Sequence, residues 1–204
     1  MAKNFAEIAF TDAVQKLQQK HGSRKAYERM ERFSHGDGLT LNEVTFIQAR
    51  DSFYLASIGV KEFPYIQHRG GPKGFLKVFG SKRIGFIDFV GNKQYVSVGN
   101  MATNTNVSLI MVDYPTRTRL KIFAKAEVVE LKGNAELHDL LNLEDYKFRP
   151  ERMIVFHIEA YDWNCPQHII PRYTKDEIKE VLATQNEYIK SLEKEIIELK
   201  EHLK

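Results

Sequence analysis

The stretch PYIQHRGGPKGFLKV, residues 64–78, decides the fold that we predict for this chain. A short aromatic and β-branched run leads into a loop with three glycines, and a second apolar run follows. Its polar and positively charged side chains are Gln67, His68, Arg69, Lys73 and Lys77. The pattern predicts two strands joined by a loop that brings backbone N–H groups and positive charge together, as a phosphate requires. A hairpin with ordinary surface charges stays open, because no P-loop or GxGxxG pattern is present.

Similar short runs of β-branched and aromatic residues repeat on both sides of this stretch. The seven runs span 53–59, 64–69, 75–79, 84–89, 107–114, 119–131 and 153–163. Turn-forming residues separate most of them, and few long helical patterns intervene. This spacing predicts a mainly β domain with flanking helices (α+β), built as a closed antiparallel barrel rather than a parallel sheet. Short helices are expected over 92–102 and 134–143.

The two ends of the chain have helical patterns. Thr11 or Asp12 can cap a first helix, and Thr40 with Glu43 forms a capping box for a later one. We therefore expect three parts: N-terminal helices packed on the barrel, the barrel itself, and a C-terminal helix. Their predicted bounds are 1–50, 51–173 and 174–204.

The C-terminal segment carries a heptad pattern that opens with a second capping box, Thr174 and Glu177. One core position holds Leu182, Ile189, Ile196 and Leu203, and the other holds Ile178, Gln185, Leu192 and Leu199. This pattern predicts a self-associating, coiled-coil-like helix, with a preference for a parallel pair in which Glu195 and Lys200 form an ion pair between chains. The alternative is a helix that lies on its own barrel. The narrow apolar stripe and the Glu- and Lys-rich outer face favour a partner helix.

Composition narrows the class of protein. The formal net charge of the 204 residues is +3, and no long basic tract is available to follow a nucleic-acid backbone. No run approaches the roughly eighteen apolar residues of a membrane span, and the N-terminus is a poor signal peptide. The single cysteine, Cys165, excludes an internal disulfide and a multi-cysteine zinc site. We expect a cytoplasmic protein that binds neither nucleic acid nor membrane.

The segment IDFVGNKQY, residues 87–95, is the second candidate for binding chemistry. A strand brings Asp88 and Phe89 to a sharp turn, after which Asn92 can cap a short helix. Helix N-termini attract anions, and Lys93 adds positive charge. The amides of Asn92 and Gln94 both donate and accept hydrogen bonds, which suits the edge of a flavin ring. On spacing alone, a plain strand–helix–strand connection is favoured.

Two further segments carry candidate residues. Arg117, Arg119 and Lys121 alternate, so on a strand they share one face, which is either solvated or clamps a phosphate or an acidic partner. Farther on, YDWNCPQHIIPRY places aromatic, histidine and arginine side chains in one irregular loop. A nucleophilic role for Cys165 lacks an orienting third group, and free cysteines are usually inert. A lid over a planar ligand fits the loop better.

Together these segments resemble a known family, the predicted flavin-nucleotide-binding proteins related to pyridoxamine 5′-phosphate oxidase. The resemblance covers about residues 10 to 175. It lies in ARDSFYLAS, PYIQHRGGPKGFLKV, DFVGNKQY followed by GN, DYPTRTRLKIFAKAEVV and NCPQHIIPR. YIQHRGGP together with NCPQHIIPR is the most specific part.

The resemblance implies a split β-barrel homodimer with two FMN sites, each built from both subunits. The strand ending at Gln67–Arg69 and the turn 88–94 would bracket the cofactor in one subunit. Arg117, Lys121 and the loop from Trp163 to Arg172 would come from the other subunit. The implied cofactor-binding residues are Gln67, His68, Arg69, Lys73, Lys77, Asp88, Phe89, Asn92, Lys93, Gln94, Arg117, Lys121, Trp163, His168 and Arg172.

The chain also departs from the family enzyme. A true oxidase has an Arg-x-Val-Leu-Leu-Lys run where this chain has Tyr65–Gly70, and an Arg-Leu-His segment that Cys165–Arg172 does not replace. We therefore predict an FMN-dependent oxidoreductase of an unnamed small-molecule substrate or electron donor, and not a pyridoxamine 5′-phosphate oxidase. The catalytic residue is unknown, although His68 and His168 are candidates for proton transfer.

Two alternatives to this function stay open. The chain could be a non-catalytic binder of flavin, deazaflavin or haem, with His68, His157 or His168 as a haem ligand. It could also be an assembly protein whose heptad helix matters more than its barrel. An absorbance spectrum separates flavin from haem.

Overall fold

The computed structural model describes residues 4–32, 38–164 and 166–202. The chain divides into two compact units. One consists of Met1–Asp113 with Thr118–Pro166, and the other of Tyr114–Arg117 with Gln167–Lys204. Cys165, for which the sequence disfavours a nucleophilic role, lies outside the described residues.

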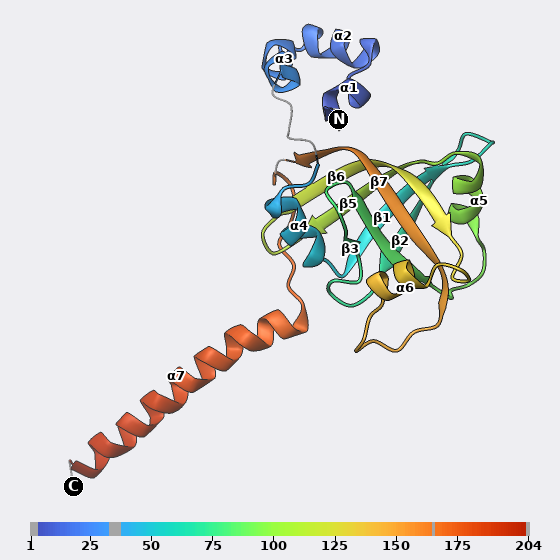
Figure 1. Cartoon of the computed structure of the whole chain (residues 1–204). Helices are drawn as coiled ribbons and strands as arrows, with labels where there is room; N and C mark the ends of the chain where they lie inside the picture. The colour runs from blue at the N-terminus through green and yellow to red at the C-terminus, as the bar shows by residue number, and fades with distance from the viewer. Residues whose placement is uncertain (1–3, 33–37, 165, 203–204) are drawn as a thin grey trace. The chain divides into compact units, whose positions relative to one another are not determined.

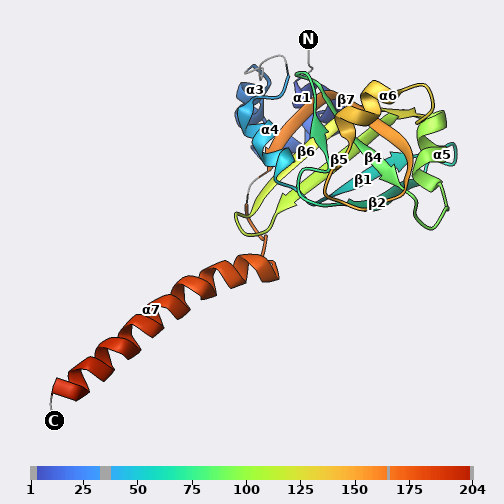
Figure 2. The same ribbon diagram turned by 60° about the horizontal axis from the view of Figure 1, so that its bottom comes forward.

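The first unit is built on one seven-stranded antiparallel sheet (Figures 1 and 2). Its strands are β1 (Ser52–Ile58), β2 (Pro64–Gly70), β3 (Lys77–Val78), β4 (Arg83–Phe89), β5 (Asn106–Asp113), β6 (Thr118–Val129) and β7 (Pro150–Asn164). They are ordered β2-β1-β5-β6-β7-β4-β3. Each strand corresponds to one of the seven predicted runs, so the mainly β prediction with an antiparallel sheet is confirmed. The short helix expected over 134–143 is also present, as α6 (Ala135–Leu141).

The prediction of a closed barrel is wrong, because the sheet does not close between β2 and β3 in the described residues. β2 and β3 end the strand order, and no pairing joins them within the described residues. β3 pairs over two residues only, because Phe75 and Leu76 before it turn into the core. The loop between the strands permits this packing: Gly74 has a φ of +79°, and a Cβ on Gly71 would lie 2.7 Å from Phe75. The sheet is therefore split beside β2.

Alternating burial along the strands forms the core. In β1, Phe53 and Leu55 point inward while their neighbours are more exposed. Phe53 packs against the rings of Phe75, Phe86 and Phe156, with centroids 5.5 to 6.0 Å apart. The pair with Phe75 is stacked and the other two are edge-to-face. Aromatic pairs of both kinds add to the hydrophobic stabilisation, so the cluster ties together strands from both ends of the order.

Helix α4 (Leu41–Gln48) begins with the predicted capping box, which is confirmed. The Glu43 carboxylate accepts hydrogen bonds from the Thr40 backbone N–H at 2.8 Å and from Trp163 Nε1 at 2.7 Å. Trp163 also packs edge-to-face on Phe46 at 4.8 Å. Burial opposes the charge on Glu43, but the hydrogen bonds from Thr40 and Trp163 outweigh it and lower the pKa of Glu43. One buried carboxylate thus holds α4 to β7.

We expect Glu43→Gln to lower the free energy of unfolding by about 1–3 kcal/mol, because an amide nitrogen would face one of two buried donors. Since the pKa of Glu43 is lowered on folding, its contribution is present above the unfolded pKa and is lost as the pH falls through the folded pKa. Chemical denaturation followed by fluorescence of Trp163, the sole tryptophan, measures the difference. Glu177→Gln, in an exposed capping box, is the control. Equal losses in both variants would contradict this account.

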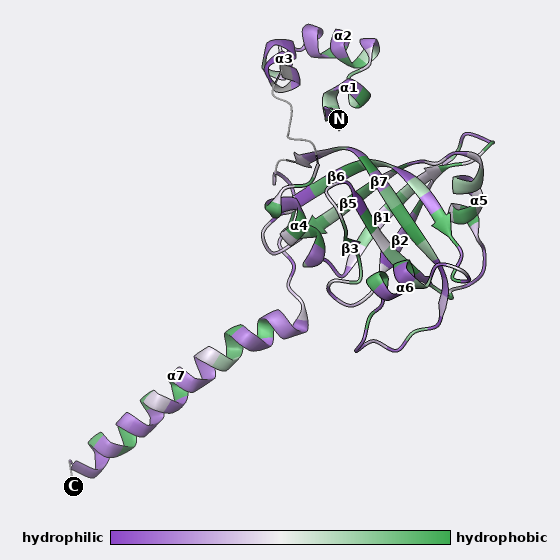
Figure 3. Cartoon of the chain, in the orientation of Figure 1, coloured by the Kyte–Doolittle hydropathy of each residue, from purple (hydrophilic) through white to green (hydrophobic). Residues whose placement is uncertain are grey.

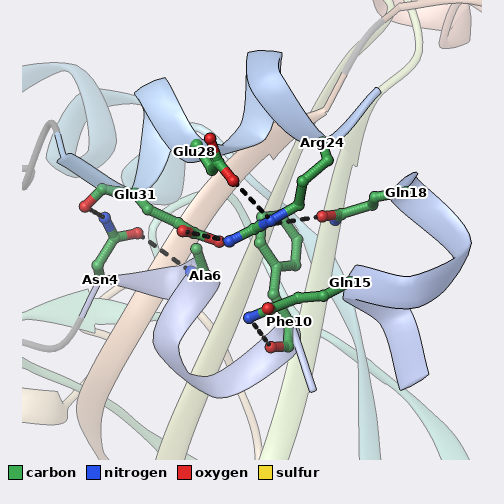
Figure 4. A network of polar contacts seen from close by, with 8 residues as sticks. All are labelled: Asn4, Ala6, Phe10, Gln15, Gln18, Arg24, Glu28 and Glu31. Carbon is green, nitrogen blue, oxygen red and sulfur yellow. Dashed lines mark hydrogen bonds and ion pairs between the residues drawn. The ribbon is translucent and has the colours of Figure 1, made fainter. Parts of the chain in front are cut away.

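Three short helices precede α4: α1 (Phe5–Ala9), α2 (Asp12–Lys20) and α3 (Arg24–Arg32). Figure 4 shows the polar network that joins them: Arg24 makes two hydrogen bonds to Glu31, at 2.6 and 2.9 Å, and a third to Gln18. α1 contacts the sheet through Phe5, whose ring stacks on Phe123 with centroids 4.7 Å apart. The polar groups of this network hydrogen-bond to one another, so we assign them a structural role in holding the three helices together.

The second unit consists mainly of α7 (Lys175–His202), which Thr174 and Glu177 cap as predicted. None of its described residues is buried. Leu203, the last predicted position of the heptad pattern, lies outside the described residues. Across the described part of the chain, the helices fall short of the length and apolar character that crossing a membrane would require.

Candidate functional site

A pocket opens beside the edge strand β2. The start of helix α5 (Val96–Thr103), the end of β4 and the start of β7 form its other walls. Its lining residues are Tyr65, Gln67, Arg69, Asp88, Phe89, Gly91–Val98, Glu151 and Arg152. The structure thus brings seven of the predicted residues together: Gln67, Arg69, Asp88, Phe89, Asn92, Lys93 and Gln94.

The alternation of β2 decides which of its side chains reach the pocket. Gln67 and Arg69 are two residues apart and face it together. His68 points to the other face of the strand, where it is exposed and its ring lies 5.5 Å from that of Tyr54. Within one chain, His68 is therefore not a pocket residue.

Two arginines share one carboxylate in the pocket. Arg69 Nη1 lies 2.5 Å from Asp88 Oδ1, and Arg152 Nη1 lies 3.8 Å from Asp88 Oδ2. The side chains are only 14%, 12% and 5% exposed for Arg69, Arg152 and Asp88. Burial raises the pKa of Asp88 and outweighs the opposing attraction of the two guanidinium groups. Three cationic side chains, Arg69, Arg152 and Lys93, line the pocket together with two carboxylates, Asp88 and Glu151.

The Nε atom of Arg69 is a buried donor with no hydrogen-bond partner among the described residues. Leaving such a donor unpaired costs about 1–3 kcal/mol, so an unpaired donor beside a pocket calls for an explanation. The Arg69 guanidinium, which lines the pocket, therefore has hydrogen-bonding capacity that Asp88 does not use.

Tyr95 adds a second group of contacts. Its hydroxyl donates to Glu151 Oε1 at 2.6 Å, and Arg152 Nη2 lies 2.9 Å from the same oxygen. The Arg152 guanidinium also lies over the Tyr95 ring at 4.9 Å. The hydrogen bond to Glu151, assisted by burial, raises the pKa of Tyr95, so the hydroxyl stays protonated at neutral pH.

The helix expected over 92–102 begins later than predicted, at Val96. Asn92 does not cap it; instead its Oδ1 accepts from the Gln94 backbone N–H at 3.2 Å, within the turn. Lys93 and Tyr95 have φ values of +60° and +56°, which no helix accommodates. Non-glycine residues in this conformation cost about 1 kcal/mol or more each and are frequent at functional sites.

The start of α5 also lines the pocket. Tyr95 occupies the N-cap position and makes no side-chain capping bond. Ser97 is buried, and its hydroxyl donates to Gln67 Oε1 at 2.6 Å, which ties α5 to β2 and orients the Gln67 amide. An uncapped helix start carries a partial positive charge and suits an anion.

Other predicted residues of the first unit lie elsewhere. Lys73 and Lys77 line a separate open pocket that also includes Asp139 and Glu144. Lys121 pairs with Asp162 at 3.1 Å, and Trp163 donates to Glu43 as described above. Lys121 and Trp163 were expected to act across a subunit interface, so their placement in one chain does not test that role.

Arg117, His168 and Arg172 belong to the second unit. Arg117 was expected to share a strand face with Arg119 and Lys121, but it lies outside the strand. Its φ of +57° places it in the turn before β6. His168 has a φ of +64°, and the Arg172 guanidinium lies 4.9 Å from the ring centre of Tyr114. Their predicted role across an interface stays a prediction.

Glu151, Arg152 and Tyr95 were missed as site residues. Tyr95 lies inside the quoted motif, and its position after Gln94 was the available signal. Glu151 and Arg152 are about sixty residues away, at the start of β7, and only the pairing of Asp88 with Arg152 in the sheet brings them into the pocket.

No protein-family model matches the sequence, and no curated protein matches it. A single-residue variant of HupZ from Group A Streptococcus is a similar solved structure, 13% identical with a TM-score of 0.50; the match covers 61% of this chain and 98% of HupZ. A candidate pyridoxamine 5′-phosphate oxidase from Lactobacillus delbrueckii is 20% identical, with a TM-score of 0.47 and coverage of 61% and 93%. An FMN-binding protein from Syntrophomonas wolfei is 13% identical, with a TM-score of 0.46 and coverage of 72% and 97%.

At these identities the likeness concerns the fold alone. At that level the predicted resemblance to the pyridoxamine 5′-phosphate oxidase-like split barrels is confirmed.

Proposed function

We propose that this chain binds FMN in the pocket beside β2 and acts as an FMN-dependent oxidoreductase of a small molecule. The observation that carries the proposal is the pair of mostly buried arginines, Arg69 and Arg152, with the unpartnered Nε of Arg69. An arginine fork with a free donor suits the planar, multidentate geometry of a phosphate.

The remaining lining residues fit the other parts of FMN. Lys93 and the uncapped start of α5 add positive charge on the phosphate side. The amides of Gln67, Asn92 and Gln94 can donate to and accept from the edge of the isoalloxazine ring. Bound FMN would supply the hydride chemistry.

The chain's own residues would bind and orient the cofactor and position protons near it. Asp88 and Glu151 hold the two guanidinium groups in place before a phosphate arrives. The protonated Tyr95 hydroxyl is the titratable donor of the pocket that was not expected from the sequence, whereas His68 faces away from it. We therefore add Tyr95 to the candidates for moving a proton.

The proposal includes a homodimer, and the outer face of β1 and β2 supports it. Ile66 is 65% exposed, and Tyr54 and Ile58 are also exposed on the neighbouring strand. The pairing of Ala56 with Ile66 places these side chains on adjacent positions of one surface. A contiguous exposed apolar surface of this kind typically marks a protein interface.

Titration with FMN and with riboflavin tests the proposal, because riboflavin lacks only the phosphate. We expect FMN to bind at least about tenfold more tightly, since a charged hydrogen bond contributes about 1.5–3 kcal/mol. Visible absorbance and the rise in melting temperature with each ligand are the readouts.

Two results would count against FMN binding: no flavin absorbance in the purified or titrated protein, or no thermal shift with FMN. Equal affinity for FMN and riboflavin would count against a phosphate contact in this pocket. A Soret band with bound iron would favour the haem alternative instead. The described residues contain no cluster of three or more His, Cys, Asp and Glu side chains placed for a metal ion.

A further inference from the structure

Helix α7 carries an apolar stripe along one face. The helix is 28 residues long, and none of its described side chains is buried. Figure 3 shows apolar residues recurring along its whole length. Helices in proteins are stabilised mainly by packing of such a face, and the ion pairs of α7, such as Lys179 with Asp176, are exposed and add little.

The exposed side chains lie at heptad spacing. They are Ile178, Leu182, Ile189, Leu192, Ile196 and Leu199, each between 39% and 58% exposed. Leu182, Ile189 and Ile196 occupy the a positions of the heptad, and Ile178, Gln185, Leu192 and Leu199 occupy the d positions. Isoleucine at a with leucine at d, as in the last two full heptads, favours two strands over three or four.

We propose that α7 pairs with α7 of a second copy as a parallel, in-register, two-stranded coiled coil. This pairing does not depend on FMN binding. Two independent features of the helix, its one polar core position and its flanking charges, select the parallel orientation.

The polar core position is Gln185. In a parallel, in-register pair, Gln185 faces its own copy, so the two amides can hydrogen-bond to each other. In an antiparallel pair, d positions of one helix face a positions of the other. When the same heptads overlap, Gln185 at d would therefore face Ile196 at a of the partner. A buried amide against isoleucine has no partner, which disfavours that orientation.

The charges beside the seam act in the same direction. In a parallel pair, Glu195 at a g position faces Lys200 at the next e position of the partner, and symmetry makes this contact twice. In the antiparallel pair, Lys179 and Lys200 at e positions would face each other across the seam, again twice. Attraction in one orientation and repulsion in the other favour the parallel pair.

Disulfide trapping in the full chain tests both pairing and orientation. Cys165→Ser first removes the only native thiol. Leu199→Cys is then introduced at a d position, where a parallel, in-register pair brings two copies into contact. We expect most of the protein to form a covalent dimer under mild oxidation. An antiparallel pair would separate the two thiols by about 25 Å, at 1.5 Å rise per residue.

Adjacent residues provide matched controls. Ile197 lies at a b position on the outer face, so Ile197→Cys is expected to trap little dimer. Added to Leu199→Cys, Ile196→Glu should abolish trapping by placing a charge in the seam, whereas Ile197→Glu should leave it unchanged.

Absence of trapping in Leu199→Cys would overturn the proposal, as would equal trapping in Ile197→Cys. A disulfide between a Leu199→Cys chain and a Leu182→Cys chain, without a disulfide between two Leu199→Cys chains, would show an antiparallel pair. That result would overturn the proposed orientation. The trapping yield is read on a non-reducing gel with and without FMN. A failure of FMN binding therefore leaves this result interpretable.

Discussion

Asp88→Ala is expected to lower the free energy of unfolding by about 3 kcal/mol, because Arg69 and Arg152 would keep their buried charges without the shared carboxylate. Breaking a buried ion pair from one side typically costs about 3–5 kcal/mol. The lower end applies here, since burial outweighs the attraction of the two guanidinium groups for the Asp88 carboxylate, as the raised pKa of Asp88 indicates. Chemical denaturation at pH 7 measures the loss.

The pH dependence has a definite sign. Because the pKa of Asp88 is raised on folding, its contribution is largest below the unfolded pKa and declines as the pH rises through the folded pKa. That decline should be missing in the variant. Inorganic phosphate should also restore more stability to Asp88→Ala than to the wild type, because the freed guanidinium groups offer it two partners.

Asp139→Ala is the control for this experiment, since Asp139 is exposed and its removal should change stability by less than about 0.5 kcal/mol. An unfolding midpoint of Asp88→Ala equal to that of the wild type would show that the arginines do not depend on Asp88.

Arg69→Gln is expected to weaken FMN binding by about 10- to 100-fold while changing riboflavin binding little. Arg69 supplies the free Nε and one of the two guanidinium groups, and a charged hydrogen bond contributes about 1.5–3 kcal/mol. Titration of both ligands, followed by flavin fluorescence, measures the two affinities. The difference between the ligands isolates the phosphate from any general damage to the pocket.

Arg83→Gln is the matched control. Arg83 lies at the start of β4, outside the pocket, and its guanidinium packs on the Phe79 ring at 4.9 Å. Arg83→Gln has the same net charge as Arg69→Gln, because each variant loses one arginine. Equal loss of FMN and riboflavin in Arg69→Gln would show a structural role only. Equal loss of FMN in both variants would point to net charge rather than to a defined phosphate contact.

Much of the local structure could be predicted from the sequence. Capping boxes at Thr40 and Thr174 depend on residues three apart, and the strands depend on alternation within a few residues. The same alternation places Gln67 and Arg69 on one face. Such patterns are readable because their physical causes lie within one turn or one strand.

The errors arose where contacts distant in the sequence, or an unusual backbone, decide the structure. A helix over 92–102 is a sound prediction from composition, but the left-handed conformations of Lys93 and Tyr95 delay it to Val96. The closed barrel failed because burial of Phe75 and Leu76 shortens β3. Neither cause leaves a periodic signal in the sequence.

For the site, the sequence by itself determined which segments carry binding chemistry: the strand with Gln67 and Arg69 and the turn after Asp88. Only the tertiary structure decided the composition of the pocket. The antiparallel pairing of β4 with β7 sets Arg152 opposite Asp88, and the seam beside β2 leaves their charges facing a cavity. Strand register and burial depend on the whole sheet, whereas residue type and alternation are local properties of the chain.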